Sequence, residues 1–355
     1  MDPLGREGFG SDGDELAMRA TMKDVALAVN VSINTVANEV HNRSARVGPE
    51  TRERILQVIA ELDYQPNLAA RQLRKAKTGI LVLAIPSLDN PYFASMATHI
   101  VKAGADQGRI VLVDHTNGQR ENELMTVRGL RPDFVDGIIF DPQTLEAADV
   151  QGLNFHIPVV LVGEQLLNAQ FDRVLIDNAA AATLATDHLI GMGRTRIAGI
   201  GLMQEGRVAV PGLRMKGFLV ALAAAGIAVD LRYIVSSIAG TFDQSEGARA
   251  MQLLLEQDPL PEAVFCFNDM MAIGAMRAAH ERGVRIPDDI AFVGIDGNDD
   301  GQYSVPTLTT IQPDKEALAR AAIDLLIQRV ESRVPRAPEV HYVPHLLIVR
   351  ESTTG

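Results

Sequence analysis

The chain contains a single cysteine among its 355 residues. One thiol excludes an internal disulfide and a cysteine-based metal site. Because Cys266 lies within the apolar run AVFCF, we predict a buried core thiol rather than a reactive one. Hydrophobic residues make up 47% of the sequence and charged residues 22%, so the chain can form sizeable cores and global disorder is not expected. A chain of this length is expected to form two or three domains.

Long apolar runs are absent too. No stretch reaches the roughly 18–20 apolar residues that a membrane-spanning helix needs, so we predict no membrane partner. The first residues, MDPLGREGFGSDGDEL, are acidic and rich in glycine, without the basic and apolar regions of a secretory signal. We therefore expect residues 1–20 to be a flexible acidic tail and the protein to be cytoplasmic.

The motifs of common enzyme classes are missing as well. The sequence holds no phosphate-binding GxxxxGK(S/T), no GxSxG nucleophile elbow, no HExxH and no CxxC. The short GIG at 199–201 lacks the full GxGxxG of a dinucleotide-binding loop and fits a turn at a strand end. Acidic residues do follow several predicted strands, but their spacing forms no local cluster of metal ligands. The sequence thus predicts no enzyme activity, no cofactor and no metal.

The charge is unevenly distributed along the chain. The net charge is −12, yet residues 19–78 carry ten lysines and arginines against six acidic residues, whereas residues 79–355 carry 22 against 34. Phosphate binding depends on the local basic face rather than on the total charge. A small basic module on a large acidic body is therefore compatible with nucleic-acid binding, although a solvated helix face would give the same charge.

Three short helices are predicted within residues 21–65. Thr21 and Asp24 have the spacing of a capping box at the start of TMKDVALAV, and Ser32 caps the following segment INTVANEVHN. The third helix begins at Pro49, because proline at the first helical position loses no hydrogen bond, and it continues through ETRERILQVIAELDY. Apolar residues at helical spacing share one face of each segment, so we predict a compact three-helix bundle.

Residues 66–78 are predicted to be a linker. Pro66 ends the third helix, and the following PNLAARQLRKAKTG is small, basic and weakly apolar. A lone helix of about two turns is only marginally stable in water. We therefore predict a hinge segment that becomes ordered only in context.

From residue 79 onward, strands and helices alternate. Apolar runs such as ILVLAIP, GIIFD, PVVLVGE and AVFCF are separated by amphipathic segments such as FASMATHIVKAGADQG and DMMAIGAMRAAHERG. Short buried strands separated by helices predict parallel sheets with right-handed crossovers. Residues 79–355 are enough for two such α/β lobes. Ligands in these folds bind beyond the carboxyl ends of the strands, so the residues just after each run are the candidates for a binding site.

These segments together resemble the lactose-repressor/galactose-repressor (LacI–GalR) family of bacterial regulators. The resemblance covers roughly residues 20–352 and rests on MKDVALAVNVS, TRERILQVIAELDYQPNLAARQL, SLDNPYF, VDGIIF, GRTRIAGIG, FNDMMAIGAMRA, GVRIPDDIAFVGIDG, PTLTTI and LLIVREST, in this order. It implies an N-terminal all-α helix-turn-helix domain, a hinge helix, and a two-lobed α/β core like that of periplasmic sugar-binding proteins. It also implies a homodimer that binds pseudo-palindromic operator DNA.

Within this family pattern, the second helix would be the recognition helix, with its N-terminal side chains on base edges in the major groove. Asn34 and Asn38 are four residues apart, and asparagine can form two hydrogen bonds to adenine. The polar residues expected to contact phosphates are Thr21, Lys23, Ser32 and Thr35. A merely solvent-facing role for the asparagines is the alternative.

The DNA-binding residues depart from the family pattern in one place. Members usually read something like TVSRVLN, whereas this chain reads TVANEVHN, so that Ala37-Asn38 replaces a Ser-Arg pair. Glu39 adds a negative charge that we expect to lie near DNA and to repel phosphate. In the hinge, Leu73 matches the leucine that family members insert into the minor groove, and Arg71 supplies positive charge beside it. Packing of Leu73 against the core is the alternative.

Residues that follow the predicted strands would form the effector site. The resemblance points to eight of them: Asn90, Tyr92, Phe93, Asp141, Arg214, Asn268, Asp269 and Asp296. Carboxylates, amides, a forked arginine donor and an aromatic face suit a polyhydroxylated ligand, so we expect a sugar or a sugar derivative. The alternative for any one of them is a helix cap or an ion pair that stabilises the lobes.

A ligand-binding receptor of the transport type is the main competing interpretation. Such a receptor would share the two-lobed core, but it would need a secretory signal and would not carry residues 20–78. We therefore interpret the chain as a sequence-specific transcriptional regulator. We expect a repressor, which is the common kind in the family that the chain resembles, and an activator is the alternative. Its operator affinity is expected to respond to a small-molecule effector bound between the lobes.

Overall fold

The computed structural model describes residues 20–40, 47–64, 77–150, 156–164, 170–202, 210–237, 241–332, 334 and 336–354. The chain divides into two units, Met1–Ala76 and Lys77–Gly355, and each is described by itself. Arg71 and Leu73 lie outside the described residues, as do nearly all of the predicted tail and of the predicted hinge.

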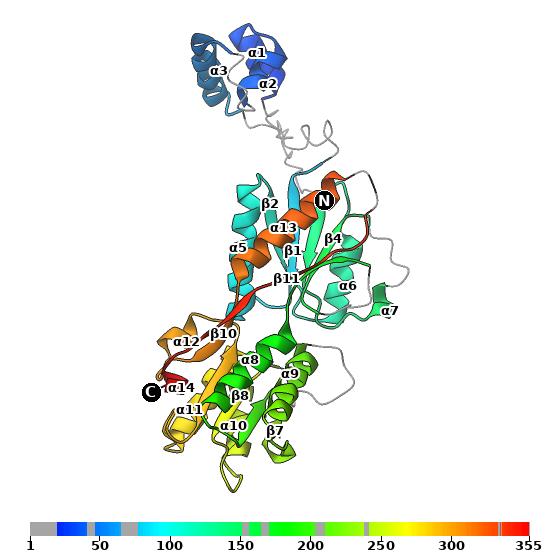
Figure 1. Ribbon diagram of the computed structural model, residues 1–355. Coiled ribbons are helices and arrows are strands. Elements are labelled where there is room, and N and C mark those ends of the chain that lie inside the picture. Colours follow the sequence, from blue (N-terminus) through cyan, green and yellow to red (C-terminus); the bar gives the residue numbers. More distant parts are fainter. Residues whose placement is uncertain are drawn as a thin grey trace, which may run out of the picture. The chain divides into compact units, whose positions relative to one another are not determined.

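The described part of the first unit is a three-helix bundle. Its helices are α1 (Met22–Val29), α2 (Ile33–Val40) and α3 (Pro49–Glu61) (Figure 1). Val25, Val29, Val36 and Ile55 are buried between them, each at most 2% exposed. These are the apolar positions at helical spacing, so the bundle forms because each short helix can bury one stripe of side chains against the other two.

Caps determine where α1 and α2 begin. The backbone N–H of Thr21 donates to the Asp24 carboxylate at 2.8 Å, and the N–H of Asp24 donates back to the Thr21 hydroxyl at 3.4 Å, which is the predicted capping box. The N–H of Thr35 donates to the Ser32 hydroxyl at 3.1 Å, which caps α2. Between the two helices Asn30 adopts a left-handed conformation with φ of 57°, which ends α1 and turns the chain toward α2.

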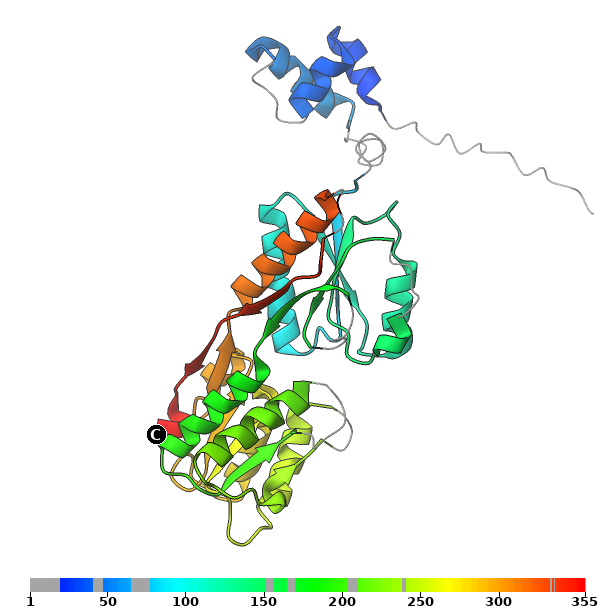
Figure 2. The ribbon, with the colours of Figure 1, turned by 45° about the vertical axis from the view of Figure 1, so that its right-hand side comes forward.

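The second unit folds into two α/β lobes, called here the N-lobe and the C-lobe (Figures 1 and 2). The strand pairs of the N-lobe sheet are all parallel, in the order β11-β5-β4-β3-β1-β2. The strands are β1 (Ile80–Ile85), β2 (Ile110–His115), β3 (Gly137–Phe140), β4 (Val159–Val162), β5 (Asp172–Ile176) and β11 (Val340–Val343). The helices are α5 (Pro91–Asp106), α6 (Arg120–Gly129), α7 (Ala147–Val150) and α13 (Lys315–Glu331).

The C-lobe sheet has the order β12-β10-β9-β8-β6-β7 and is parallel as predicted, except that the edge strand β12 runs antiparallel to β10. The strands are β6 (Ile197–Ile200), β7 (Ile234–Val235), β8 (Ala263–Cys266), β9 (Ala291–Ile295), β10 (Thr309–Pro313) and β12 (His345–Ile348). The helical elements are α8 (Asn178–Gly191), α9 (Val210–Ala224), η2 (Leu231–Tyr233), α10 (Gln244–Leu254), α11 (Asp269–Glu281), α12 (Asp300–Tyr303) and α14 (Glu351–Thr354).

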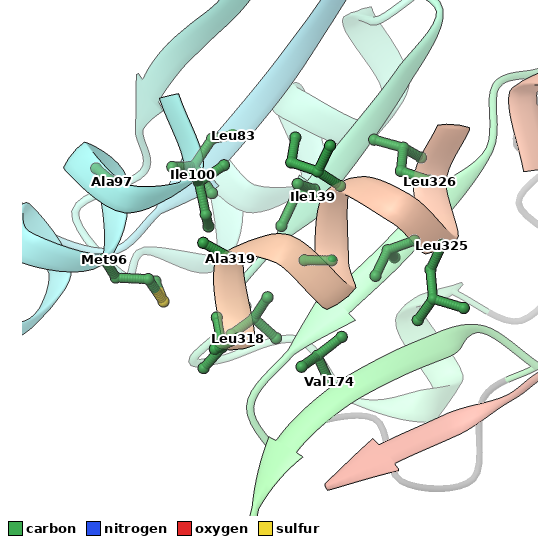
Figure 3. Close-up of a cluster of buried hydrophobic side chains, with 14 of the residues drawn as sticks. Leu83, Met96, Ala97, Ile100, Ile139, Val174, Leu318, Ala319, Leu325 and Leu326 are labelled. Atoms are coloured by element: carbon green, nitrogen blue, oxygen red, sulfur yellow. The ribbon is translucent and has the colours of Figure 1, made fainter. Parts of the chain in front are cut away.

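Helices cover both faces of each sheet, and the hydrophobic cores lie between the layers. In the N-lobe, α5 and α13 pack on one face over Leu83, Ile139 and Val174 (Figure 3), and α6 packs on the other. In the C-lobe, α8 and α9 cover one face, and α10 and α11 cover the other. Cys266 is fully buried in the C-lobe core, as the sequence predicted, and burial raises the pKa of its thiol. Among the described residues, no helix combines the length and the hydrophobicity of a membrane span.

The chain passes between the two lobes three times, and we call these three connecting segments the crossovers. The chain passes from β5 to α8 at Asp177, from β10 to α13 at Asp314, and from β11 to β12 at Pro344 (Figure 2). Asp177 and Asp314 cap the helices that follow them, accepting from the N–H groups of Ala180 and Ala317. The N–H of Asp314 also donates to the carbonyl of Pro344 at 2.9 Å, so two of the crossovers are tied together.

Close approach of α10 and α11 depends on glycine. A Cβ atom added at Gly274 would overlap the backbone of Gln244. We expect Gly274→Ala to lower the free energy of unfolding by about 1–3 kcal/mol, because the two helices would have to separate. Gly129→Ala is the control, since its Cβ would meet no atom within 4 Å and alanine favours the helix by up to ~1 kcal/mol. Urea unfolding measures both, and a Gly274→Ala protein as stable as the wild type would contradict the prediction.

Candidate DNA-binding surface and effector site

Helix α2 presents a polar face away from the core of the helical bundle. Val36 is fully buried, whereas Asn34 is exposed and Thr35 and Asn38 are half-buried. Lys23, on α1, is exposed as well. The predicted base-contacting and phosphate-contacting side chains of α1 and α2 are therefore on the outside of the bundle, where DNA can reach them.

The hydroxyl groups at the two helix starts already have partners. The Thr21 hydroxyl donates to the Asp24 carboxylate at 2.7 Å, and the hydroxyls of Ser32 and Thr35 are 2.8 Å apart. These bonds hold the caps in place. Contacts of the same residues with phosphates stay a prediction.

The expectation that Glu39 lies near DNA is corrected by the structure. Its side chain is buried, and its carboxylate pairs with Nε of Arg52 on α3 at 2.8 Å. Glu39 is three residues after the buried Val36, so it falls on the same face of the helix and not on the polar one. The ion pair with the half-exposed Arg52 joins α2 to α3.

The N-lobe half of the candidate effector site is formed by the ends of β1, β3 and β4. Asn90 caps α5 by accepting from the N–H of Tyr92 at 2.9 Å. Tyr92 and Phe93 meet edge to face with ring centroids 5.3 Å apart, and both pack against the N-lobe core. The helix cap thus fixes the position of Tyr92, whereas Phe93 mainly supports it.

Two buried carboxylates lie at the ends of neighbouring strands in this lobe. Asp141 follows β3 and accepts from the Gln143 amide at 2.8 Å, and Glu164 follows β4. Burial raises the pKa of Asp141 well above its usual range, and repulsion from Glu164 and Glu123 raises it further. Burial also raises the pKa of Glu164. This half of the candidate site therefore holds two carboxyl groups, each of which can accept a hydrogen bond and, when protonated, can also donate one.

Arg214 is the central cation of the C-lobe half. Its side chain is buried, with Arg214 only 5% exposed. Its Nε donates to Asn178 at 2.7 Å, and its Nη1 donates to the carbonyl of Phe267. The centroid of the Phe267 ring lies 4.5 Å from the guanidinium carbon, which is a cation–π contact. Nη2 lies 3.9 Å from the Asp296 carboxylate, beyond direct hydrogen-bonding distance.

Asp296 and Asp269 are neighbouring acids with different surroundings. Asp269 accepts from the Thr310 hydroxyl at 2.6 Å and from the N–H of Asn298 at 2.8 Å, so it holds the strand ends together, and its pKa is raised by burial to about 6. Asp296 has a φ of 135°, which is uncommon for a residue with a side chain. Its pKa is raised to about 7, mainly by burial and further by Asp269.

Asn268 is engaged in local structure. Its amide oxygen accepts from the N–H of Met271 at 2.8 Å, which caps α11, and its NH2 group donates to the carbonyl of Phe242 at 2.8 Å. A helix cap was the alternative to ligand contact, and the geometry favours that alternative. Contact with an effector stays a prediction for this residue.

Lys315 was not predicted, and it links the lobes. It is the first residue of α13, directly after the crossover at Asp314, and its ammonium group donates to the carbonyl of Gly297 at 3.2 Å. The same nitrogen lies 5.5 Å from the centroid of the Tyr92 ring. Burial lowers the pKa of Lys315, whereas Asp296 and Asp269 raise it. The ammonium thus lies among groups of both lobes.

The predicted residues of the two lobes meet around Tyr92. Burial raises the pKa of its phenol, and Asp296 and Asp141 raise it further while Arg214 lowers it, so groups of both lobes are close enough to act on it. Sequence reasoning missed Glu164, Asn178 and Lys315. All three lie within two residues of a strand end or of a crossover, which is the signal that could have found them. Among the described residues, no three His, Cys, Asp or Glu side chains gather as a metal site would require.

Two protein-family models match the chain. The model for bacterial regulatory proteins of the lacI family matches residues 21–67, and the model for a periplasmic binding protein-like domain matches residues 186–353. The chain is 34% identical to the ribose operon repressor of Halalkalibacterium halodurans over 94% of this chain and 97% of that repressor. The chain belongs to the lacI family of bacterial regulatory proteins.

Other relatives of this lacI-family regulator are similar over nearly their whole length. The transcriptional repressor PurR of Erwinia tasmaniensis is 33% identical over 95% of this chain and 98% of PurR. The lac repressor dimer bound to operator and the anti-inducer ONPF has a TM-score of 0.80 at 26% identity, covering 95% of this chain and 99% of that one. The complex of the transcriptional regulator CelR with cellobiose has a TM-score of 0.69 at 28% identity, covering 94% of this chain and all (100%) of that one. The predicted family and fold class are confirmed, and these relatives are regulators rather than enzymes.

The raised pKa of Asp296 predicts how the stability of this lacI-family regulator depends on pH. The folded protein keeps the proton of Asp296 up to about pH 7, whereas the unfolded chain loses it near the ordinary value of 3.8. The folded state therefore binds more protons in this window, so the free energy of unfolding should fall as the pH rises through it. In Asp296→Asn this fall should be smaller. Urea unfolding between about pH 5 and pH 8 measures it.

The control for this prediction is Asp187→Asn, which changes an exposed aspartate on α8. It should keep the pH dependence of the wild type. An Asp296→Asn protein with the same pH dependence as Asp187→Asn would show that Asp296 keeps an ordinary carboxylate in the folded state.

Proposed function

We propose that the chain is a repressor that binds a pseudo-palindromic operator as a homodimer. A small effector bound between the lobes either lowers or raises its affinity for the operator. The observation that carries this proposal is the meeting of buried groups of both lobes. The ammonium of Lys315 donates to Gly297 of the C-lobe and lies 5.5 Å from the centroid of the Tyr92 ring of the N-lobe. Arg214 of the C-lobe is joined through Asn178 to Glu164 of the N-lobe. Such groups cost stability unless they are paired, so their concentration at the strand ends favours a ligand site. We place the protein in the cytoplasm, since a regulator acts where its DNA lies.

The DNA-binding part of the proposal is supported by the outer face of α2. Asn34 and Asn38 are accessible there, and both fit base readout. Lys23 and the N-terminal ends of α1 and α2 fit phosphate contacts. The neutralisation of Glu39 by Arg52 removes the repulsion that the sequence suggested. Arg71 and Leu73 are proposed to contact the minor groove, as the family resemblance implies.

A carbohydrate is the proposed class of effector. Asp141 and Asp296 offer acceptors for hydroxyl groups, Arg214 offers donors, and Tyr92 offers an aromatic face. Among the relatives, one is a ribose operon repressor and one was solved with cellobiose. We propose Asn90, Phe93, Asn268 and Asp269 as the support around these contacts. A coupling between effector and operator of ~1–3 kcal/mol would change operator affinity ~5–150-fold.

Operator recognition is tested by selection from a random DNA library, which should return a symmetric motif because the two-fold axis of a dimer is mirrored in its site. Asn34→Ala and Asn38→Ala should relax the preference at particular bases by about 1–3 kcal/mol. Lys23→Ala should weaken binding to all DNA sequences alike, and the slope of log affinity against log salt concentration should become shallower by about one. Equal behaviour of the asparagine and lysine variants would contradict the division into base and phosphate contacts.

Effector binding is tested by a thermal-shift screen of neutral sugars and sugar acids, because a ligand that binds only the folded state raises its stability by RT ln(1+[L]/Kd). Arg214→Ala should lose the shift that an active sugar produces, and its operator binding should remain. Arg277→Ala is the matched control, since Arg277 is exposed on α11 and pairs with Glu281 in a surface ion pair. A full ligand response of Arg214→Ala would remove this residue from the site.

A further inference from the structure

A chain of three hydrogen-bonded side chains connects the end of β4 in the N-lobe with α9 in the C-lobe. The carboxylate of Glu164 accepts from Nδ2 of Asn178 at 2.6 Å, and Oδ1 of Asn178 accepts from Nε of Arg214 at 2.7 Å. Glu164, Asn178 and Arg214 are 5%, 3% and 5% exposed. We call these three residues the relay. It passes directly beside the crossover at Asp177, which precedes Asn178.

Each hydrogen bond of the relay has only one direction open to it. A guanidinium can only donate, so Asn178 must turn its oxygen toward Arg214. The NH2 group of Asn178 then faces Glu164, and an ionised carboxylate can only accept. The two charged ends therefore select one of the two orientations of the amide. A side chain without an acceptor at position 164 would leave the NH2 group buried without a partner.

The other end of the relay faces the proposed effector site. A guanidinium is rigid and planar, so the direction of Nε also determines the direction of Nη2. Nη2 lies 3.9 Å from the Asp296 carboxylate, a separation too long for a direct hydrogen bond. A ligand hydroxyl between them could accept from Arg214 and donate to Asp296. The alignment of Arg214 therefore depends on a residue of the opposite lobe.

We propose that Glu164 is a positioning residue, which orients the guanidinium of Arg214 through Asn178 and so ties the C-lobe half of the effector site to β4 of the N-lobe. This inference rests on the effector site proposed above. Burial of Glu164 disfavours its charged form and raises its pKa, although the hydrogen bond from Asn178 and the charge of Arg214 lower it. An energetically unfavourable buried charge is expected mainly at sites where function requires it. Direct contact of Glu164 with the effector is the alternative that the experiments separate.

The first experiment observes the Arg214 side chain in the free full-length protein. Isotope-labelled arginine gives an NMR signal for each Nε–H, and Arg214→Lys identifies the one that belongs to Arg214. Glu164→Met removes the acceptor at similar volume, whereas Glu164→Gln keeps an acceptor oxygen. Hydrogen exchange of this Nε–H should be at least about tenfold faster in Glu164→Met, because a buried hydrogen bond to a charged side chain is lost. In Glu164→Gln the exchange rate should change less than about threefold, because an acceptor remains.

Glu246→Met is the matched control, since Glu246 is also buried but belongs to α10 and pairs with Arg249. It should leave the exchange of the Arg214 Nε–H unchanged. Asn178→Ala removes the middle of the relay and should act like Glu164→Met, which provides a second variant if Glu164→Met does not fold. An Arg214 signal that is unchanged in both Glu164→Met and Asn178→Ala overturns the proposal.

The second experiment uses D-ribose and cellobiose as probes in thermal shifts of the same variants. Positioning predicts wild-type affinity in Glu164→Gln and about tenfold weaker binding in Glu164→Met. Equal weakening in both variants, with an unchanged Arg214 signal, would mean direct contact and would overturn the proposal. If neither sugar stabilises the wild type while Glu164→Met still speeds the Arg214 exchange, the proposed sugar effector fails and the positioning role of Glu164 stands.

Discussion

A guanidinium buried between two sheets is the constraint on which the site depends. Arg214 cannot lose its proton in the interior, so every one of its nitrogens has to find an acceptor or a counter-charge there. The structure meets this demand with a side-chain amide at a crossover, a main-chain carbonyl at a strand end and a carboxylate of the next strand. Groups that are distant in the sequence are brought together to satisfy a single charge, and they form the effector site that we propose.

The alternation of strands and helices could be predicted from the sequence because parallel strands buried on both faces appear as short, continuous apolar runs. Each such run quoted above became a strand. The assignment of elements to lobes could not be predicted in the same way. Helix α13 packs on the N-lobe sheet although it follows the C-lobe strand β10, and β11 and β12 belong to different sheets although they are consecutive. Local patterns carry no information about which sheet a returning segment joins.

The site residues likewise differ in whether they could be predicted from the sequence. Asp296 could be found because the family resemblance and the strand-end rule agree on it, whereas Arg214 lies on α9 and was found from the resemblance alone. Glu164 and Lys315 also follow strands, but one acid or one lysine after a strand has no distinguishing pattern. Glu39 is the opposite case, because its spacing from Val36 already placed it on the buried face of α2. The helical periodicity was sufficient there, whereas the identity of the partner, Arg52, required the packing of α3.

The crossovers also affect how the protein emerges from the ribosome. The N-lobe sheet ends with β11 and one of its faces is covered by α13, so neither its edge nor its core is complete until residue 343 has been made. The C-lobe, whose edge strand is β12, is finished only a few residues later. Neither lobe can therefore be completed long before the other, and a premature stop ahead of β11 would leave both sheets without an edge strand.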